Sequence, residues 1–182
     1  MDYKMLVNKN NLLDEHFKVD NLVKTDSLYK DDIYLEKEAF KAFTLLKNDA
    51  LKYGHHFDIM SGYRTREYQK NLFDELVLEK GYNYASSYIA LPGSSEHETG
   101  LAIDVAVYIK DKTYIEHDLE NLDAVKWLQS NAHKYGFIIR YPKNKEEITK
   151  YNYEPWHIRY VGSISAYLYN NDLTLEEYHQ KF

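Results

Sequence analysis

The chain has 182 residues and a net charge of -6, and it contains no cysteine. This length suits one domain with a sizeable core, and the acidic balance argues against a nucleic-acid binder, which would normally present a basic face. Without cysteine, disulfides and thiolate metal ligands are excluded, so any metal site must use His, Asp or Glu side chains.

The first part of the chain predicts a polar arm followed by two helices with a strand between them. Residues 1–32 are polar and irregular. Apolar side chains recur at helical spacing over residues 34–53, which indicates a helix with one face in the core. Residues 57–60 favour a short strand, and Thr65 can cap a second helix. Arg64 therefore lies at a junction between a strand and a helix, where side chains commonly face a cleft.

The central part of the chain combines a histidine-bearing turn with an apolar strand. Residues 82–93 are predicted to form a loop that leads into this turn. His97 is followed by Gly100, where the chain must change from loop to strand. From residue 101 the sequence Leu-Ala-Ile-Asp-Val-Ala-Val-Tyr-Ile alternates, which places Asp104 on the face opposite the large aliphatic side chains. A carboxylate in such a strand is costly unless it is paired or binds a metal.

The last part of the chain predicts a charged surface loop, a helix, a strand and two terminal helices. They cover residues 110–120, 122–135, 137–141, 163–170 and 173–182. The surface loop contains His117, which we interpret as solvated because acidic residues surround it.

A second histidine-bearing segment, Glu154-Pro155-Trp156-His157, follows residues that are rich in tyrosine. Its composition is strand-like, but in a regular strand the side chains of Glu154 and His157 would lie on opposite faces. We therefore expect a bend or bulge at Pro155 that brings both side chains toward one site.

Together His97, Asp104 and His157 could bind one zinc ion. Three protein ligands leave one position open for water, as a catalytic zinc site requires. Two nitrogen ligands and one oxygen ligand are also a donor set that suits zinc. Glu154 could act beside the metal as a general base. These residues therefore predict a zinc hydrolase.

These motifs resemble the VanY-type D-alanyl-D-alanine carboxypeptidases. Their relatives include peptidoglycan L,D-carboxypeptidases and the D-Ala-D-Ala dipeptidases of vancomycin resistance. The resemblance rests on Ser95-x-His97-x-x-Gly100-x-Ala102-x-Asp104 followed by Glu154-x-x-His157. It covers nearly the whole chain, because further matching stretches occur at residues 6–10, 61–65, 135–142 and 173–178. The sequence departs from the family's usual form at Thr149-Lys150-Tyr151, where a glycine after the threonine is common.

The resemblance implies an α+β fold in which a small central antiparallel sheet carries the zinc site and is flanked by helices. It implies a single zinc peptidase domain over residues 1–182, with residues 1–32 as an N-terminal arm that wraps the domain. A monomer is expected, with no nucleic-acid partner.

The resemblance also implies roles for the site residues. Glu154 and Arg64 would be catalytic, the first as general base and the second by polarising the scissile carbonyl or binding the substrate carboxylate. Ser95 and Gln69 would contact the substrate. Trp156 would line the substrate site, and we interpret it mainly as a packing residue that orients the base and the neighbouring ligand.

The implied substrate is the D-alanine-terminated stem peptide of peptidoglycan or its precursor. We expect a D,D-carboxypeptidase, with an L,D-carboxypeptidase acting on stem tetrapeptides or a D-Ala-D-Ala dipeptidase as alternatives. An alternative of a different class is a non-catalytic, zinc-containing binding module that resembles the signalling domain of Hedgehog proteins. The presence of Glu154 argues against that alternative, since a binding module needs no general base.

The cellular location has two interpretations. No apolar run in the sequence is long enough for a transmembrane helix, and no apolar signal-peptide region follows the first residues. We expect an extracytoplasmic, cell-wall-associated protein whose leader or anchor has been removed. A cytoplasmic protein is the alternative.

Overall fold

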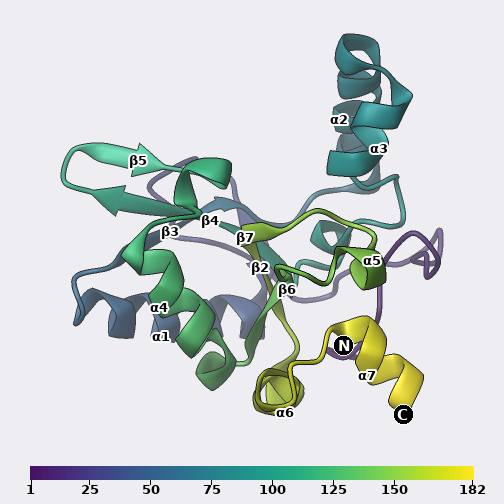
Figure 1. The fold of residues 1–182 in the computed structure, drawn as a ribbon. Helices are drawn as coiled ribbons and strands as arrows, with labels where there is room; N and C mark the ends of the chain where they lie inside the picture. Colours follow the sequence, from purple (N-terminus) through teal and green to yellow (C-terminus); the bar gives the residue numbers. More distant parts are fainter.

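The centre of the molecule is a five-stranded antiparallel sheet (Figure 1). The structure is a computed structural model that describes all 182 residues. Four strands follow the order β3-β4-β7-β6, and β5 pairs with the end of β4. Their bounds are β3 (His56–Ser61), β4 (Ala102–Ile109), β5 (Lys112–Tyr114), β6 (Phe137–Tyr141) and β7 (Glu154–Tyr160). A separate two-stranded sheet pairs β1 (Leu22–Lys24) with β2 (Tyr34–Glu36).

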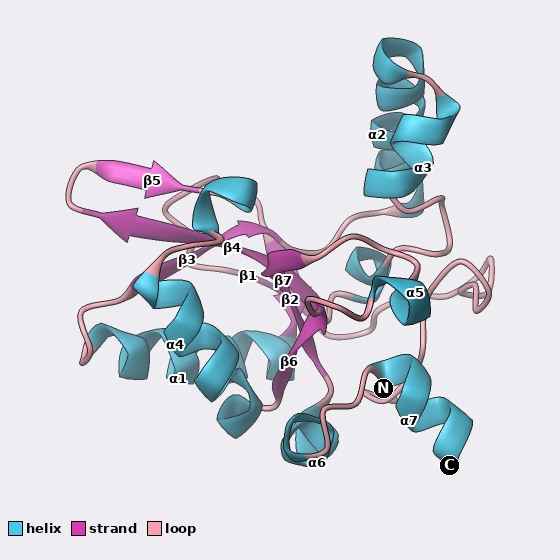
Figure 2. Ribbon diagram, viewed as in Figure 1, coloured by secondary structure: helices cyan, strands magenta, loops and turns pink.

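Helices surround this sheet, as Figure 2 shows in cyan. They are α1 (Lys37–Leu51), α2 (Arg66–Lys80), α3 (Tyr82–Tyr88), α4 (Asp123–Asn131), α5 (Glu146–Thr149), α6 (Ser165–Asn170) and α7 (Leu175–Lys181). Short 3-10 turns cover Glu96–Thr99, Glu116–Leu119, Ala132–Tyr135 and Gly162–Ile164. The predicted α+β fold with a small antiparallel sheet flanked by helices is confirmed. None of the helices combines the length and apolar character that crossing a bilayer would require.

The main hydrophobic core lies between one face of the sheet and the helices α1 and α4. The alternation predicted for β4 is present, because Ile103, Val105 and Val107 all point into this core. From α1, Phe43 and Leu46 pack against them and are fully buried. Burying side chains of this size contributes about 1.5–3 kcal/mol each. This core holds the strands in register and leaves their opposite face for other side chains.

The opposite face of the sheet carries buried polar groups. They are Asp104, Arg140, His157 and Arg159. The N-terminal arm and α7 cover part of this face, since Arg159 donates a hydrogen bond to the Met5 carbonyl and Asn8 donates one to Glu176 of α7. The polar face is therefore enclosed by segments from both ends of the chain.

Two segments predicted as loops contain regular structure. The loop expected at residues 82–93 includes helix α3, which has one buried residue, Ala85, and hence no apolar stripe to reveal it. The loop expected at residues 110–120 includes β5, which exists because its backbone pairs with β4, with Tyr114 opposite Val107. Neither element has a strong local pattern, so both depend on tertiary partners.

Helices α2 and α3 pack side by side and project from the rest of the molecule (Figures 1 and 2). As predicted, Thr65 caps α2, its side chain accepting a hydrogen bond from the Tyr68 backbone N–H. Phe73 of α2 contacts Tyr82 of α3 edge to face, with ring centroids 5.9 Å apart. The α2–α3 hairpin thus lies beside the polar face of the sheet.

Candidate active site

Three side chains of metal-ligand type converge on the polar face of the sheet. Ligand atoms of His97, Asp104 and His157 all lie within 4.8 Å of one another, and the three residues are buried. Asp104 and His157 are direct partners on β4 and β7, so antiparallel pairing places both on one face. His97 comes from the turn Glu96–Thr99, which ends at Gly100 with a φ of 69°. Glycine adopts this left-handed conformation without strain.

Hydrogen bonds orient the ring of His97. Its Nδ1 lies 2.7 Å from the Gly62 carbonyl oxygen, which can only accept. Nδ1 therefore carries the proton, and the lone pair of Nε2 faces Asp104 Oδ2 at 3.1 Å. Burial and the nearby Arg64 guanidinium lower the pKa of His97, which favours the neutral imidazole that metals bind.

His157 presents its other ring nitrogen to the same point. Its Nδ1 lies 3.2 Å from Asp104 Oδ1, whereas its Nε2 points away, toward Glu96 Oε2 at 3.5 Å. The atoms that converge are therefore Nε2 of His97, the carboxylate of Asp104 and Nδ1 of His157.

This cluster fits a zinc ion. Although burial opposes ionisation, the imidazoles of His97 and His157 hold the pKa of Asp104 well below its usual range, so the carboxylate is charged. Its Oδ1 is buried and is not aligned for a hydrogen bond with any group. An anionic oxygen left in this way is costly unless a cation binds it. Two imidazole nitrogens and one carboxylate oxygen are ligands that zinc prefers.

A bulge in β7 turns Glu154 toward the cluster. Tyr141 of β6 pairs with Glu154, but Ile139 pairs with Ile158, so β7 contains extra residues between the two pairs. As a result Glu154 Oε2 lies 3.7 Å from His157 Nδ1, although the two residues are three positions apart. The bend predicted near Pro155 is confirmed.

The environment of Glu154 tunes its acidity. Burial raises the pKa of its carboxyl to about 7, although the neighbouring His157 opposes the shift. A carboxyl with a pKa near neutral pH can both accept and return a proton, which is the requirement for a general base that later acts as an acid.

Arg64 lies next to the metal-ligand cluster. Its guanidinium donates to Asp104 Oδ2 at 2.9 Å and to Ser61 Oγ at 2.9 and 3.1 Å. Its backbone N–H also donates to the His97 carbonyl at 3.1 Å. The start of α2 is therefore tied to both the turn and the strand that carry the cluster.

Gln69 is buried inside the first turns of α2, with 1% of its surface exposed. Its Nε2 donates to the Ala90 carbonyl at 2.8 Å, and its Oε1 lies 3.5 Å from Arg64 Nη1. The side chain therefore connects Arg64 with the segment that follows α3.

A cleft of about 770 Å³ opens over the cluster. The residues assigned to the site from the sequence all line it: Arg64, Gln69, Ser95, His97, Asp104, Glu154, Trp156 and His157. One wall is the α2–α3 hairpin, with Tyr68, Tyr84 and Tyr88.

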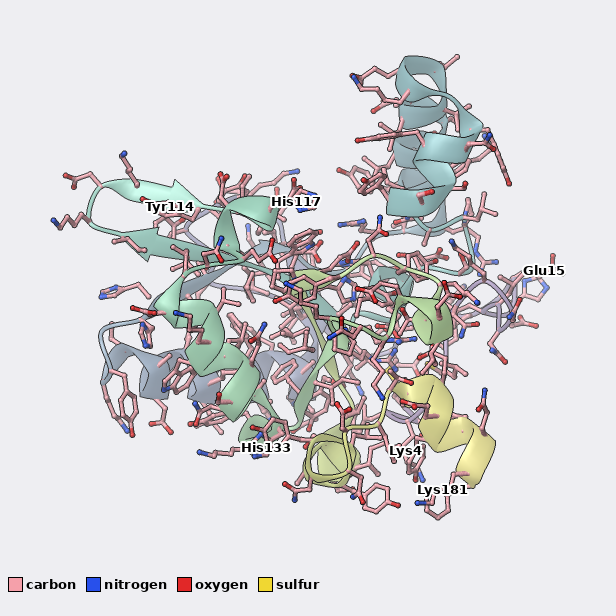
Figure 3. All side chains as sticks on the ribbon, in the orientation of Figure 1. Lys4, Glu15, Tyr114, His117, His133 and Lys181 are labelled. Carbon is pink, nitrogen blue, oxygen red and sulfur yellow. The ribbon has the colours of Figure 1, made fainter.

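His117 is exposed, in agreement with its interpretation as a solvated residue. It lines the same cleft, at the edge of the body nearest to α2 and α3 (Figure 3). Its ring packs edge to face on Trp156, with centroids 4.9 Å apart. Trp156 itself is part of the hydrophobic core, so one of its surfaces is buried and another faces the cleft.

A buried ion cluster behind His157 was absent from the sequence-based assignment. Glu96 Oε1 accepts from Arg140 Nε at 2.6 Å and from Arg159 Nη1 at 2.7 Å. Although burial opposes ionisation, these two guanidinium groups hold the pKa of Glu96 well below its usual range. The available signal was an arginine inside each of two apolar strands, since such a residue requires a buried anion.

We expect Gly62→Ala to damage both the fold and the metal site. A Cβ at this position would lie 2.6 Å from the Tyr34 carbonyl oxygen and 2.9 Å from Ile33 Cγ2, so β3 must shift together with the carbonyl that orients His97. The free energy of unfolding should fall by about 1–3 kcal/mol, and zinc affinity should fall with it. Thermal unfolding and zinc titration measure the two effects.

Gly54→Ala is the control, because no atom lies within 4 Å of its Cβ and only its backbone conformation is affected. Wild-type behaviour of Gly62→Ala would contradict the prediction.

Comparison with known proteins matches this chain to one family of carboxypeptidases. The model of the VanY family, described as D-alanyl-D-alanine carboxypeptidase, matches residues 32–163. YodJ of Bacillus subtilis (strain 168) is 46% identical over 182 residues, covering 97% of this chain and 66% of YodJ. A D-alanyl-D-alanine carboxypeptidase of Enterococcus faecium is 42% identical over 164 residues, covering 88% of this chain and 49% of that protein. This chain therefore spans about half to two thirds of the length of these relatives.

Solved structures share the fold. The LdcB LD-carboxypeptidase, described with the molecular basis of its peptidoglycan recognition, superposes with a TM-score of 0.89 at 44% identity, over 97% of this chain and 85% of that one. A mutant of the vancomycin resistance D,D-pentapeptidase VanY from a VanB-type cassette, in complex with Zn(II), superposes with a TM-score of 0.85 at 32% identity. It is matched over 98% of this chain and 99% of that one.

Proposed function

Because the chain belongs to the VanY family of D-alanyl-D-alanine carboxypeptidases, we propose that it is a zinc-dependent carboxypeptidase that removes the C-terminal D-alanine from peptidoglycan stem peptides. The observation that carries this proposal is the position of Glu154, a base with a pKa near 7 beside the buried cluster of His97, Asp104 and His157. This arrangement combines a metal site and a proton carrier in one cleft. We also propose that residues 1–182 form one peptidase domain.

His97, Asp104 and His157 would hold the zinc ion. A bound zinc supplies Lewis acidity, which polarises the scissile carbonyl and lowers the pKa of a water molecule. The Glu154 carboxylate accepts a proton from the attacking water and transfers it to the amine nitrogen of the departing D-alanine. A single carboxyl can perform both transfers because its pKa is near neutrality.

Arg64 and the residues along the cleft would bind and orient the substrate. The Arg64 guanidinium, already next to Asp104, would stabilise negative charge on the carbonyl oxygen or bind the terminal carboxylate of the peptide. Gln69 would contact the substrate and hold Arg64 in place, and Ser95 would donate a hydrogen bond near the scissile bond. Trp156 would form an apolar wall beside Glu154.

The D,D-carboxypeptidase activity is the first candidate for the stereochemistry of the scissile bond. It rests on the 42% identity to the E. faecium D-alanyl-D-alanine carboxypeptidase. The L,D-carboxypeptidase activity is the second candidate, because the LdcB structure is 44% identical to this chain. A D-Ala-D-Ala dipeptidase, which would need an enclosed pocket, is the third candidate. The stem peptide would be the partner, and its location in the cell wall supports extracytoplasmic action. We also propose that the protein acts as a monomer.

Mass spectrometry of three substrates tests this proposal. Zinc-loaded protein would be incubated with stem pentapeptide, stem tetrapeptide and free D-Ala-D-Ala. We expect loss of one alanine from the pentapeptide, because the C-terminal D-Ala-D-Ala bond would lie over the metal site. Loss only from the tetrapeptide would assign the L,D activity. Cleavage of none of the three by zinc-loaded protein would overturn the carboxypeptidase proposal and favour the binding module.

A further inference from the structure

We propose that Glu96 is a positioning residue that selects the tautomer of His157, so that His157 Nδ1 keeps its lone pair for the metal. This inference rests on the proposed zinc site and adds to it a residue that touches neither metal nor substrate. It is carried by the arrangement of buried atoms around Nε2 of His157.

The two carboxylate oxygens of Glu96 have different environments. Oε1 accepts from both Arg140 and Arg159, at 2.6 and 2.7 Å, so its two lone pairs are used. Oε2 lies 3.5 Å from His157 Nε2, and neither of these two buried atoms makes a hydrogen bond in the structure. Glu96 Oε2 is therefore the polar atom that is available to His157 Nε2.

A carboxylate can only accept a hydrogen bond, so Glu96 Oε2 favours a proton on Nε2 of His157 once a metal occupies the space between Nδ1 and Asp104 Oδ1, which are 3.2 Å apart. The lone pair is then left on Nδ1, which faces Asp104 and Glu154 at 3.2 and 3.7 Å. Carboxylate groups behind metal-binding imidazoles commonly fix ring orientation and tautomer in this way. His97 is oriented by the Gly62 carbonyl instead. The two histidines are therefore oriented by different groups, a backbone carbonyl and a side-chain carboxylate.

The surrounding ion cluster prevents Glu96 from rotating. Arg140 donates two further hydrogen bonds to Glu176 of α7, at 2.8 and 2.7 Å. Arg159 donates to the Met5 carbonyl of the N-terminal arm at 2.9 Å. Two guanidinium groups balance two carboxylates in this enclosed space, and segments from both ends of the chain anchor them. The orientation of Glu96 Oε2 toward His157 is thus set by the tertiary fold.

Glutamine at position 96 would reverse the tautomer. Its single oxygen must face the two arginine donors, because an amide NH2 there would meet only other donors. The NH2 group would then face His157 Nε2, where it needs an acceptor, and this favours a proton on Nδ1. A protonated Nδ1 cannot bind a metal, so Glu96→Gln should weaken zinc binding while preserving side-chain volume.

Glu98→Gln is a matched control. Glu98 belongs to the same turn and is equally buried, but its oxygens accept from the Gly93 N–H at 2.6 Å and from Arg66 Nε at 3.0 Å. Its substitution also loses a charged acceptor in this turn, yet no histidine ring depends on it. Any loss of zinc affinity from general damage to the turn should appear in both variants.

Competition with a chelator measures the zinc dissociation constant of the full chain and of both variants. We expect Glu96→Gln to raise it by about 10–100-fold, the range typical of groups that orient metal ligands, and Glu98→Gln to raise it by less than about 3-fold. Equal effects of the two substitutions, or an unchanged constant in Glu96→Gln, would overturn the inference.

Nitrogen-15 NMR of labelled histidine gives a second readout, because it reports which ring nitrogen carries the proton. General damage to the turn would not change that position. In zinc-loaded protein the wild type should show the metal on Nδ1 and the proton on Nε2 of His157, whereas Glu96→Gln at the same zinc concentration should show His157 partly unbound. If Glu96→Gln does not fold, the wild-type spectrum alone decides, because a proton on Nδ1 there would overturn the inference. If the two variants differ in zinc affinity as expected but the wild type cleaves no peptide, the result would contradict the proposed function and leave the role of Glu96 intact.

Discussion

Replacing Glu154 with glutamine is expected to lower kcat by about 10²–10⁴-fold, because the amide cannot accept the proton from the attacking water. Zinc binding should remain, since His97, Asp104 and His157 are unchanged and glutamine has nearly the same volume. The measurement is single-turnover cleavage of the stem peptide that the wild type accepts, together with zinc content. Activity within about tenfold of wild type would show that another group moves the proton.

The same substitution has a pH-dependent effect on stability that does not depend on substrate. In the folded protein the pKa of Glu154 is raised from 4.5 to about 7, so the folded state binds more protons than the unfolded state between these values. The stability of the wild type therefore falls as pH rises from about 4.5 to about 7, by about 3 kcal/mol at most. Glutamine does not titrate, so in zinc-free protein Glu154→Gln should unfold at a higher temperature than wild type at pH 8. The difference should shrink toward pH 5, and a difference independent of pH would contradict the assigned shift.

Arg140→Met is expected to lower the free energy of unfolding by about 3–5 kcal/mol, because it leaves buried carboxylates without their main partner. Arg140 is fully buried and donates hydrogen bonds to both Glu96 and Glu176. After its removal Glu176 would keep only the Asn8 amide, at 3.1 Å. For a domain of this size the melting temperature should fall by about 10 °C.

Urea and thermal unfolding measure this effect, and Lys126→Met is the control. Lys126 pairs with Asp123 on the surface of α4, at 2.9 Å with both side chains largely exposed, so its loss should change stability by less than about 0.5 kcal/mol. A double variant, Arg140→Met with Glu176→Leu, should recover part of the lost stability by removing one of the stranded charges. Equal stability of Arg140→Met and wild type would show that the cluster does not support the fold.

The patterned elements were predictable from local sequence. The alternation around Asp104 predicted β4 and the face on which the carboxylate lies, and Thr65 predicted the start of α2. The conflict between the spacing of Glu154 and His157 and a regular strand predicted the bulge in β7. In each case the cause is steric or hydrogen-bonding chemistry among residues a few positions apart, which a single stretch of sequence contains.

Elements without such a pattern were not predictable. Helix α3 has one buried residue, and β5 is held by its backbone pairing with β4. Nothing local indicated the burial of Gln69, which depends on the segment after α3 that accepts its hydrogen bond. His117 is exposed as interpreted, but nothing local indicated that the fold would place it beside Trp156 at the cleft. Each outcome depends on a neighbour distant in the sequence.

What the sequence alone determined is the chemistry of the site: two imidazoles, two carboxylates and an arginine, in motifs whose local geometry presents them together. Residue type and short-range spacing carry that information, because they decide which atoms can donate, accept or bind a metal. Only the tertiary structure decided which ring nitrogen of His157 faces the metal position. Glu96, Arg140 and Arg159 meet across separations of 44 and 63 residues. A buried charge is stable only with its partners around it, and those partners come together only when the sheet has formed.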